Sequence, residues 1–238
     1  MCTVTFFKTN SGFIITSNRD ENIARESASE IFEENLGSSK LYYPLDPKSR
    51  GSWFCMKSNG SVFVLLNGAT KNHLKKPNYR KSRGLILMEI AKSESFMLTW
   101  LEIELDEIEP FTLIICATNN LFQLQWDGTS KKLKKIDPNF PKIWSSSTLY
   151  SPEIRKEREK WFQEFIKQNQ NQIDEMSIWR FHTETEKENL DNGLMINRNL
   201  TMLTKNVTQC HVTQKKIEIK HLDTVNGLFE TLNTELTI

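Results

Sequence analysis

Cys2 and the four hydrophilic residues Asn18-Arg19-Asp20-Glu21 are the residues of this chain whose types and spacing suggest chemistry. An apolar stretch that reads as a hairpin connects them. A two-residue loop at Asn10-Ser11 would place Cys2 directly opposite Arg19, and cross-strand Cβ atoms are about 4.5–5.5 Å apart. A three-residue loop would place Asn18 or Asp20 opposite Cys2 instead. In either register, a thiol lies beside a guanidinium and a carboxylate.

This arrangement suggests a nucleophile at the start of the chain. Methionine aminopeptidases remove Met1 when a small residue follows, which would give Cys2 a free α-amino group. The amine has an ordinary pKa of about 7.7–8.0 and the thiol about 8.5, so the amine can accept the thiol proton near neutral pH. Arg19 would stabilise the thiolate, and Asp20 would orient the ammonium group. The alternative is that Cys2 is a small buried residue in an edge strand, with Arg19 and Asp20 forming a surface ion pair.

Two further hairpins are predicted downstream. Asn59-Gly60 favours a type I′ two-residue loop between strands at 52–57 and 61–67. In that register Asn67 faces Ser52 and lies diagonal to Trp53. Asn119-Asn120 is expected to join strands at 111–118 and 121–126, because asparagine tolerates positive φ.

The apolar pattern predicts sheets that are covered on both faces. Residues 62–66 and 113–115 are continuously apolar rather than alternating, which is typical of strands buried on both sides. Helices are expected over 85–93, 96–105, 151–168 and 173–181, the third with Ser151 as N-cap and Pro152 at its first position, and late strands near 207–213 and 216–222. This order predicts one α+β domain over residues 1–238, with two stacked, mostly antiparallel sheets flanked by helices.

Composition limits the classes of function. The chain of 238 residues has a net charge of +1, which argues against a nucleic-acid-binding protein. Its apolar runs are shorter than the roughly 20 residues of a membrane-spanning helix, and the first 17 residues do not resemble a signal peptide. The four scattered cysteines fit reduced thiols in a cytoplasmic protein, and the four histidines lack metal-ligand spacing. We therefore expect neither a metal nor a cofactor.

Several motifs resemble a known family. Met-Cys at the start, with Asn-Arg-Asp-Glu closing the second strand, is similar to the NRDE-motif family, which includes the transport-and-Golgi-organisation type 2 proteins. Gly51-Ser52-Trp53, Asn67 and Ser82-Arg83-Gly84 resemble further features of that family, and the likeness spans most of the chain. The resemblance implies the N-terminal nucleophile hydrolase superfamily, with a four-layer αββα sandwich.

The resemblance also implies roles for individual residues. Cys2 would attack the carbonyl carbon of a C–N amide bond in a small acyl substrate, and Arg19 and Asp20 would tune the thiol. Asn67 would donate to the developing oxyanion together with a backbone N–H group. The positions expected to contact substrate are Asn18, Glu21, Trp53, Arg83 and Ser147.

Two positions depart from the family pattern. Ser147 lies in a serine-rich stretch where relatives carry a Ser-Asn pair, and Lys205 stands where they often have arginine. Lysine cannot form the bidentate fork of a guanidinium. These departures favour an alternative function, that of a non-catalytic binding or transport protein for a lipid, acyl-CoA or haem-like ligand. The basic segment 71–83 could attract an anionic ligand or form a solvated loop.

Overall fold

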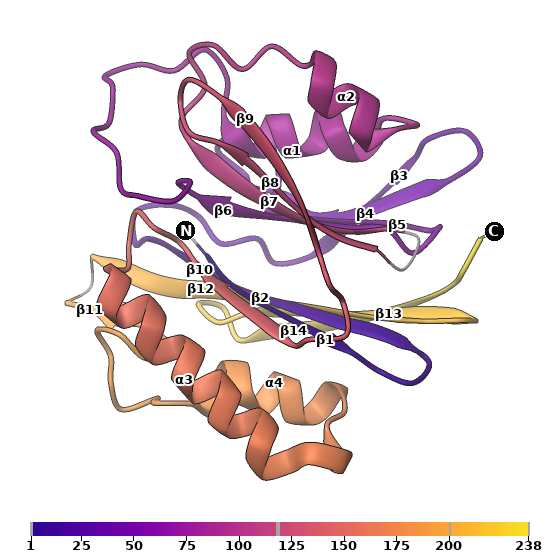
Figure 1. Ribbon diagram of the computed structural model, residues 1–238, viewed down its shortest axis with the longest axis vertical. Helices are drawn as coiled ribbons and strands as arrows, with labels where there is room; N and C mark the ends of the chain where they lie inside the picture. The colour runs from indigo at the N-terminus through magenta and orange to yellow at the C-terminus, as the bar shows by residue number, and fades with distance from the viewer. Residues whose placement is uncertain (1, 118–119, 200, 238) are drawn as a thin grey trace.

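The computed structural model describes residues 2–117, 120–199 and 201–237, in which two antiparallel sheets are stacked between two helical layers (Figure 1). The first sheet has the strand order β10 (Lys142–Ser145), β1 (Cys2–Lys8), β2 (Gly12–Asn22), β12 (Met202–Thr213), β13 (Lys216–Asp223) and β14 (Leu228–Glu235), with β11 (Asn197–Arg198) paired to β12. The second has the order β3 (Ile31–Asn35), β4 (Lys40–Pro44), β5 (Phe54–Lys57), β6 (Val62–Asn67), β7 (Phe111–Ala117), β8 (Asn120–Trp126) and β9 (Lys131–Ile136).

The helices cover the outer faces of the two sheets. Helices α1 (Arg83–Lys92) and α2 (Phe96–Glu102) pack on the second sheet, and α3 (Pro152–Asn169) and α4 (Glu175–Glu184) pack on the first, with a short 3-10 turn at Gln170–Gln172 between them (Figure 1). This arrangement confirms the expected αββα sandwich.

The observed helix bounds differ from the predicted ones by up to three residues. Ser151 accepts a hydrogen bond from the backbone N–H of Ile154, as the predicted N-cap does, and Ser82 caps α1 in the same way, so α1 begins at Arg83, two residues before its predicted start. Helix α2 ends at Glu102, three residues before the predicted end. Helix α4 begins at Glu175 rather than residue 173, because Asp174 and Ser177 form a capping box.

The first hairpin has the predicted register. Thr9 and Gly12 flank the two-residue loop, and Cys2 pairs directly with Arg19. The hydrophilic cluster does not close the strand, however. β2 continues to Asn22, because the late strand β12 supplies its hydrogen-bonding partners. β1 is also not an edge strand, since it lies between β10 and β2.

The registers of the other two predicted hairpins were wrong. Phe54 pairs with Val64, so the loop that connects β5 to β6 has three residues and Asn67 does not face Ser52. Gly60 at the end of this loop has a φ of +81°, the left-handed conformation typical of such loops. In the third hairpin Asn120 already belongs to β8, where it pairs with Ala117, and the predicted loop residue Asn119 lies outside the described residues.

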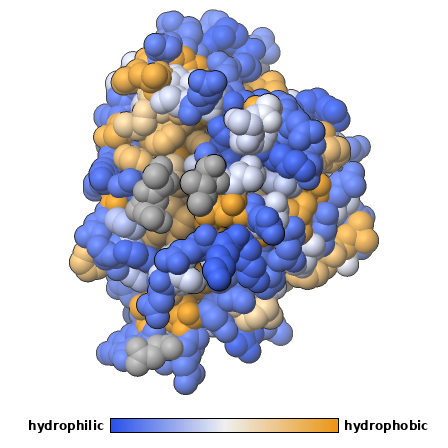
Figure 2. Space-filling model, turned by 90° about the vertical axis from the view of Figure 1, so that its right-hand side faces the viewer, coloured by the Kyte–Doolittle hydropathy of each residue, from blue (hydrophilic) through white to orange (hydrophobic). Residues whose placement is uncertain are grey.

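The largest apolar core lies between the two sheets and under α1. β6 is buried on both faces up to Leu66, as its continuous apolar run predicts. A second apolar cluster under α3 and α4 includes Ile14, Phe162 and Phe181. The face that carries the C-terminal strands and the β1–β2 turn is mostly hydrophilic, with scattered apolar patches (Figure 2). Within the described residues, none of the helices is both long and apolar enough to cross a bilayer.

Candidate active site

A cavity of about 600 Å³ lies beside Cys2, between the start of β1, the loop before β5 and the start of α1. Six of the nine residues that sequence analysis singled out line it together: Cys2, Arg19, Glu21, Trp53, Asn67 and Arg83. The other three, Asn18, Asp20 and Ser147, do not line this cavity. The geometry of the first sheet explains this division.

Cys2 is held at one end of the central part of the first sheet. Its carbonyl oxygen accepts a hydrogen bond of 3.0 Å from the Ser146 N–H, and the residue is 2% exposed. Burial raises the pKa of the Cys2 thiol, and the nearby Asp20 charge acts in the same direction. A thiol in this environment needs a neighbouring base before it can act as a nucleophile.

Arg19 is fixed by an acidic partner that sequence analysis did not identify. Its Nη2 atom lies 2.6 Å from Oδ2 of Asp46, which also accepts from Nη2 of Arg25 at 2.6 Å. Burial alone would raise the pKa of Asp46, but hydrogen bonds from Arg25 and the Ser49 N–H and the charge of Arg19 hold it below its ordinary value. The Arg19 guanidinium is therefore paired with the ionised carboxylate of Asp46. Its Cζ atom lies 4.4 Å from the centre of the Trp53 ring.

Two residues that line this cavity, Arg19 and Trp53, each carry a buried donor without a partner in the described part of the chain. Nη1 of Arg19 and Nε1 of Trp53 have no hydrogen-bond partner among the described residues, and both residues are less than 5% exposed. Buried donors usually have partners, because an unpaired one costs about 1–3 kcal/mol. Both atoms donate and neither accepts, so they fit an oxygen acceptor such as a carbonyl or carboxylate.

Asp20 lies on the opposite face of β2, as side-chain alternation requires. Its carboxylate accepts from the Tyr150 hydroxyl and the Thr204 hydroxyl, each at 2.7 Å. Burial raises the pKa of Asp20, while the charge of Arg158 and these hydroxyls act against that rise. The side chain of Asp20 is thus directed into the layer between the first sheet and α3.

Asn18 lies on that same face and has no contact with the cavity beside Cys2. Its Nδ2 donates to the carbonyl oxygens of His182 and Leu194, and its Oδ1 lies 2.6 Å from Nδ1 of His182. Nε2 of His182 lies 2.7 Å from the Thr5 hydroxyl. The amide of Asn18 joins the sheet to α4, so the structure does not bring Asn18 to this cavity.

The two departures from the family pattern also lie apart from the cavity beside Cys2. The Ser147 hydroxyl donates to the Lys71 carbonyl at 3.3 Å and lines a different cavity. Lys205 lies at a β-bulge in β12 and donates to the Ile23 carbonyl at 3.1 Å. Asn67 does line the cavity beside Cys2, at the end of β6.

Arg83 and Trp53 are positioned by a contact between two glycines. A Cβ atom on Gly51 would lie 2.5 Å from the carbonyl carbon of Gly84, and one on Gly84 would lie 2.9 Å from the Ser52 oxygen. The start of α1 therefore touches the backbone before β5. This contact gives a physical reason for glycine in both Gly51-Ser52-Trp53 and Arg83-Gly84. Arg83 itself is 3.0 Å from Glu109.

Replacing Gly51 by alanine is expected to destabilise the protein by about 1–3 kcal/mol, because the new Cβ would meet backbone atoms that cannot move independently. A cost of 1 kcal/mol corresponds to a fall of about 2–4 °C in Tm for a chain of this size. Thermal unfolding followed by circular dichroism measures the change. Lys48→Ala, at an exposed position of the same loop, is the control. Equal Tm values for the two variants would contradict the glycine contact.

Arg158 is a fully buried charged residue in this region that was not singled out from the sequence. It is fully buried on α3, donates to the Thr3 hydroxyl and to the carbonyl oxygens of Asn192 and Gly193, and lies 3.6 Å from the centre of the Tyr150 ring. Arg158 is four residues from Ile154 and from Phe162, so it lies on the apolar stripe of the helix. A charge within an apolar stripe was the available signal. Asp46 offers no comparable signal in the sequence.

The architecture and the position of the cysteine define a class of protein. A four-layer αββα sandwich with a buried cysteine at the start of its first central strand has the fold of the N-terminal nucleophile hydrolases. The chain belongs to the Transport and Golgi organisation 2 family, whose model matches residues 1–232. This membership confirms the resemblance seen in the sequence.

Solved structures with the same fold include two hydrolases. A mutant of conjugated bile acid hydrolase from Clostridium perfringens is similar with a TM-score of 0.60 and 9% identity, over 100% of this chain and 97% of that chain. The N-acylethanolamine-hydrolyzing acid amidase orthologue of Caenorhabditis elegans gives a TM-score of 0.58 and 10% identity, over 87% of this chain and 92% of that chain. No curated protein sequence matches this chain significantly. At identities of 9% and 10%, the similarity to these structures shows a shared fold only.

Proposed function

We propose that this protein is an N-terminal cysteine hydrolase that cleaves a C–N amide bond in a small acyl substrate after removal of Met1. The observation that carries the proposal is that Cys2, Arg19 and Asn67 line one cavity, with Arg19 paired directly to Cys2 across the hairpin. The cavity volume of about 600 Å³ lies within the range of small-molecule sites. The four cysteines are free and buried, which fits the reducing cytosol.

In the proposed reaction the α-amine of Cys2 accepts the thiol proton, and the thiolate attacks the acyl carbonyl carbon. Asn67 donates a hydrogen bond to the resulting oxyanion. The C–N bond then breaks, and the leaving amine takes the proton from the α-ammonium group, which leaves a thioester on Cys2. A water molecule, deprotonated by the same amine, hydrolyses this thioester, releases the carboxylic acid and restores the thiol.

In this proposal Asp20 does not orient the α-ammonium group by a direct hydrogen bond, which is the role expected from the sequence. Because its carboxylate is held by Tyr150 and Thr204 on the opposite face of β2, it acts on the cavity through its charge and through the position of the strand. Arg19 lines the cavity itself, so its positive charge acts directly on the thiolate and on the substrate. We therefore assign Asp20 as a positioning residue.

The first experiment is an intact-mass measurement of the protein purified from cells. We expect the mass of the chain without Met1, because the proposed base exists only when the α-amine belongs to Cys2. A chain that retains Met1 has no such base and would exclude the mechanism. Cys2 alkylation at pH 7, compared with the buried Cys210, gives an independent measure of thiol activation.

A binding protein without catalysis is the second candidate. The observation that favours it is the environment of Cys2, where burial raises the thiol pKa, together with serine and lysine at positions 147 and 205. Such a protein would hold a lipid, acyl-CoA or haem-like ligand in the same cavity. A panel of acyl amides separates the two functions, because hydrolysis that depends on Cys2 excludes a role in binding alone.

A further inference from the structure

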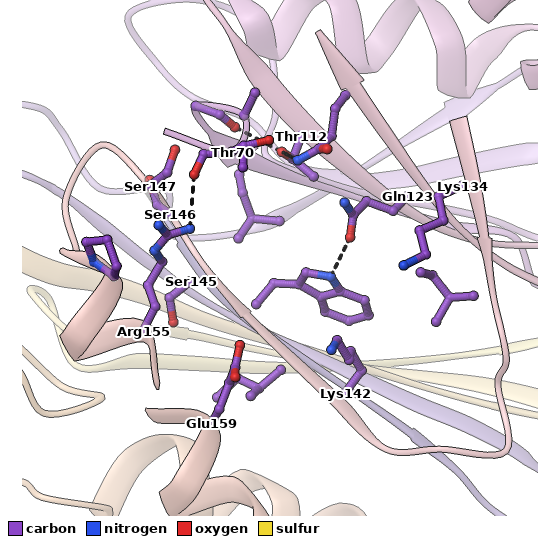
Figure 3. A pocket seen from close by; sticks show the side chains of 18 of the residues that line it. Thr70, Thr112, Gln123, Lys134, Lys142, Ser145, Ser146, Ser147, Arg155 and Glu159 are labelled. Carbon is purple, nitrogen blue, oxygen red and sulfur yellow. Dashed lines mark hydrogen bonds between the residues drawn. The ribbon is translucent and has the colours of Figure 1, made fainter. Parts of the chain in front are cut away.

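A second cavity, of about 610 Å³, lies between the sheets at the edge formed by β9 and β10. Its walls are built from β8, β9, β10, the segment after β6 and the first turns of α3. Figure 3 shows Lys134 and Lys142 on one side of this cavity and Arg155 with Ser145, Ser146 and Ser147 on the other. The proposed hydrolase chemistry uses none of these side chains.

The charge of this cavity is strongly unbalanced. Its lining contains five cations and two carboxylates, a net charge of +3, and the cations are Lys134, Lys135, Lys142, Arg155 and Lys156. Within the described residues, none of these cations forms an ion pair, and none of the four ammonium groups has a hydrogen-bond partner. The positive charge is therefore available to an anionic ligand, and cavity walls of low dielectric strengthen its field.

The cavity also has an apolar and aromatic part. Trp144 lines it, and its indole Nε1 is fixed by a hydrogen bond of 2.8 Å to Oε1 of Gln123. Phe140 is 68% exposed at the rim, and Ile136 and Leu66 add aliphatic surface. Aromatic and aliphatic side chains combined with a few polar groups are the usual lining of small-molecule sites.

Two polar atoms in the wall lack partners. The Ser145 hydroxyl oxygen and Nε of Arg155 are buried and have no hydrogen bond among the described residues. Nη1 of Arg155 donates to the Thr70 carbonyl at 3.3 Å (Figure 3). Both unpaired atoms can donate a hydrogen bond, but they lie on the side of the cavity opposite Lys134 and Lys142, so the anionic group bound by the two lysines does not use them (Figure 3).

We propose that this second cavity binds an organic anion that combines a flat apolar body with a phosphate, sulfonate or carboxylate group. The body packs against Trp144 and Phe140, and the anionic group is bound by Lys134 and Lys142. This site goes beyond the proposed hydrolase activity, because Cys2 does not line it. The two cavities meet at Asn67, which lines both of them.

The probe for this proposal is 1-anilinonaphthalene-8-sulfonate, whose fluorescence rises when it enters an apolar site. We expect saturable binding that weakens when NaCl is raised from 0.05 to 0.5 M, because salt screens the lysines. N-phenyl-1-naphthylamine has the same ring system without the sulfonate, and we expect it to bind at least about tenfold more weakly. Equal affinities for the two probes would contradict a site for anions.

Charge reversal locates the site. Lys134→Glu and Lys142→Glu are each expected to weaken binding of the sulfonate probe at least about tenfold. Lys132→Glu is the control on the same strand, because Lys132 lies two residues away on β9, is also exposed and does not line the cavity; unlike Lys134 it forms an ion pair with Asp127, at 3.3 Å. Lys81→Glu changes the cavity beside Cys2 instead. Both controls should alter the Kd less than about twofold.

The remaining outcomes are equally informative. Similar losses in Lys132→Glu and Lys134→Glu would show a general effect of surface charge and overturn the proposal. A loss confined to Lys81→Glu would place the probe beside Cys2 and also overturn it. Circular dichroism and Tm confirm that each variant is folded. Because Cys2→Ala leaves this cavity intact, unchanged probe binding in that variant separates a failure of this proposal from a failure of the hydrolase proposal.

Discussion

Replacing Cys2 by alanine is expected to lower kcat/KM for acyl amide hydrolysis by at least about a thousandfold. The substitution removes the nucleophile, and no other described cysteine lines the cavity. Alanine is also small enough for Met1 to be removed, so the variant keeps a free α-amine at position 2. The variant therefore lacks the nucleophilic thiol but keeps the proposed base, so a loss of activity can be assigned to the thiol. Steady-state rates on the most rapidly cleaved acyl amide of the panel give the measurement.

Cys210→Ala is the matched control for this variant. Cys210 is a buried free cysteine in β12, and it belongs to the same apolar core as Cys2. Removing the Cys210 thiol should destabilise the protein about as much as Cys2→Ala does. It should leave kcat/KM within about twofold of the wild-type value. If Cys2→Ala and Cys210→Ala kept equal activity, the thiol of Cys2 would have no catalytic role. Intact mass of both proteins shows whether Met1 is absent in each.

The first hairpin was predictable because its geometry depends on residues that are close in sequence. A two-residue turn fixes the register, and the register places Arg19 opposite Cys2. The second hairpin shows the limit of the same reasoning, since Asn59-Gly60 suits both a two-residue and a three-residue loop. The observed loop has three residues, which shifted the predicted partner of Asn67 by one position.

The partners of the hydrophilic cluster could not be predicted in this way. Asp46 reaches Arg19 from a loop 27 residues later, and Thr204 reaches Asp20 from a strand 184 residues later. These contacts depend on how the late strand β12 pairs with β2, and the sequence offers no turn or spacing that specifies this pairing. The sequence therefore indicates the cysteine and its cross-strand neighbour but not the groups that hold them in place.

Side-chain alternation divides the Asn18–Glu21 cluster between two environments. Arg19 and Glu21 face the cavity beside Cys2, whereas Asn18 and Asp20 face the layer under α3 and α4. Two of the four residues thus contact the space where a ligand would bind, and two connect the strand to the helices. The four residues are all hydrophilic, but they face two different environments because side chains in a β-strand alternate between its two faces.

The protein is expected to lose stability as the pH falls below about 6.5, because of His182. Burial and the charge of Arg158 lower the pKa of His182 to about 3. The unfolded chain binds a proton near pH 6.5 that the folded protein does not bind until about pH 3, so the contribution of His182 is complete above pH 6.5 and is lost as the pH falls. Between pH 7 and pH 4 the loss amounts to about 3 kcal/mol, at about 1.4 kcal/mol for each pH unit.

Urea unfolding of the wild type and of His182→Gln at pH 7, 6, 5 and 4 tests this expectation. Glutamine cannot take up a proton, so the variant should be less stable at pH 7, where it lacks the contacts with Asn18 and Thr5, but should have a flatter dependence on pH. Parallel curves for the wild type and His182→Gln would mean that His182 titrates alike in the folded and unfolded chains.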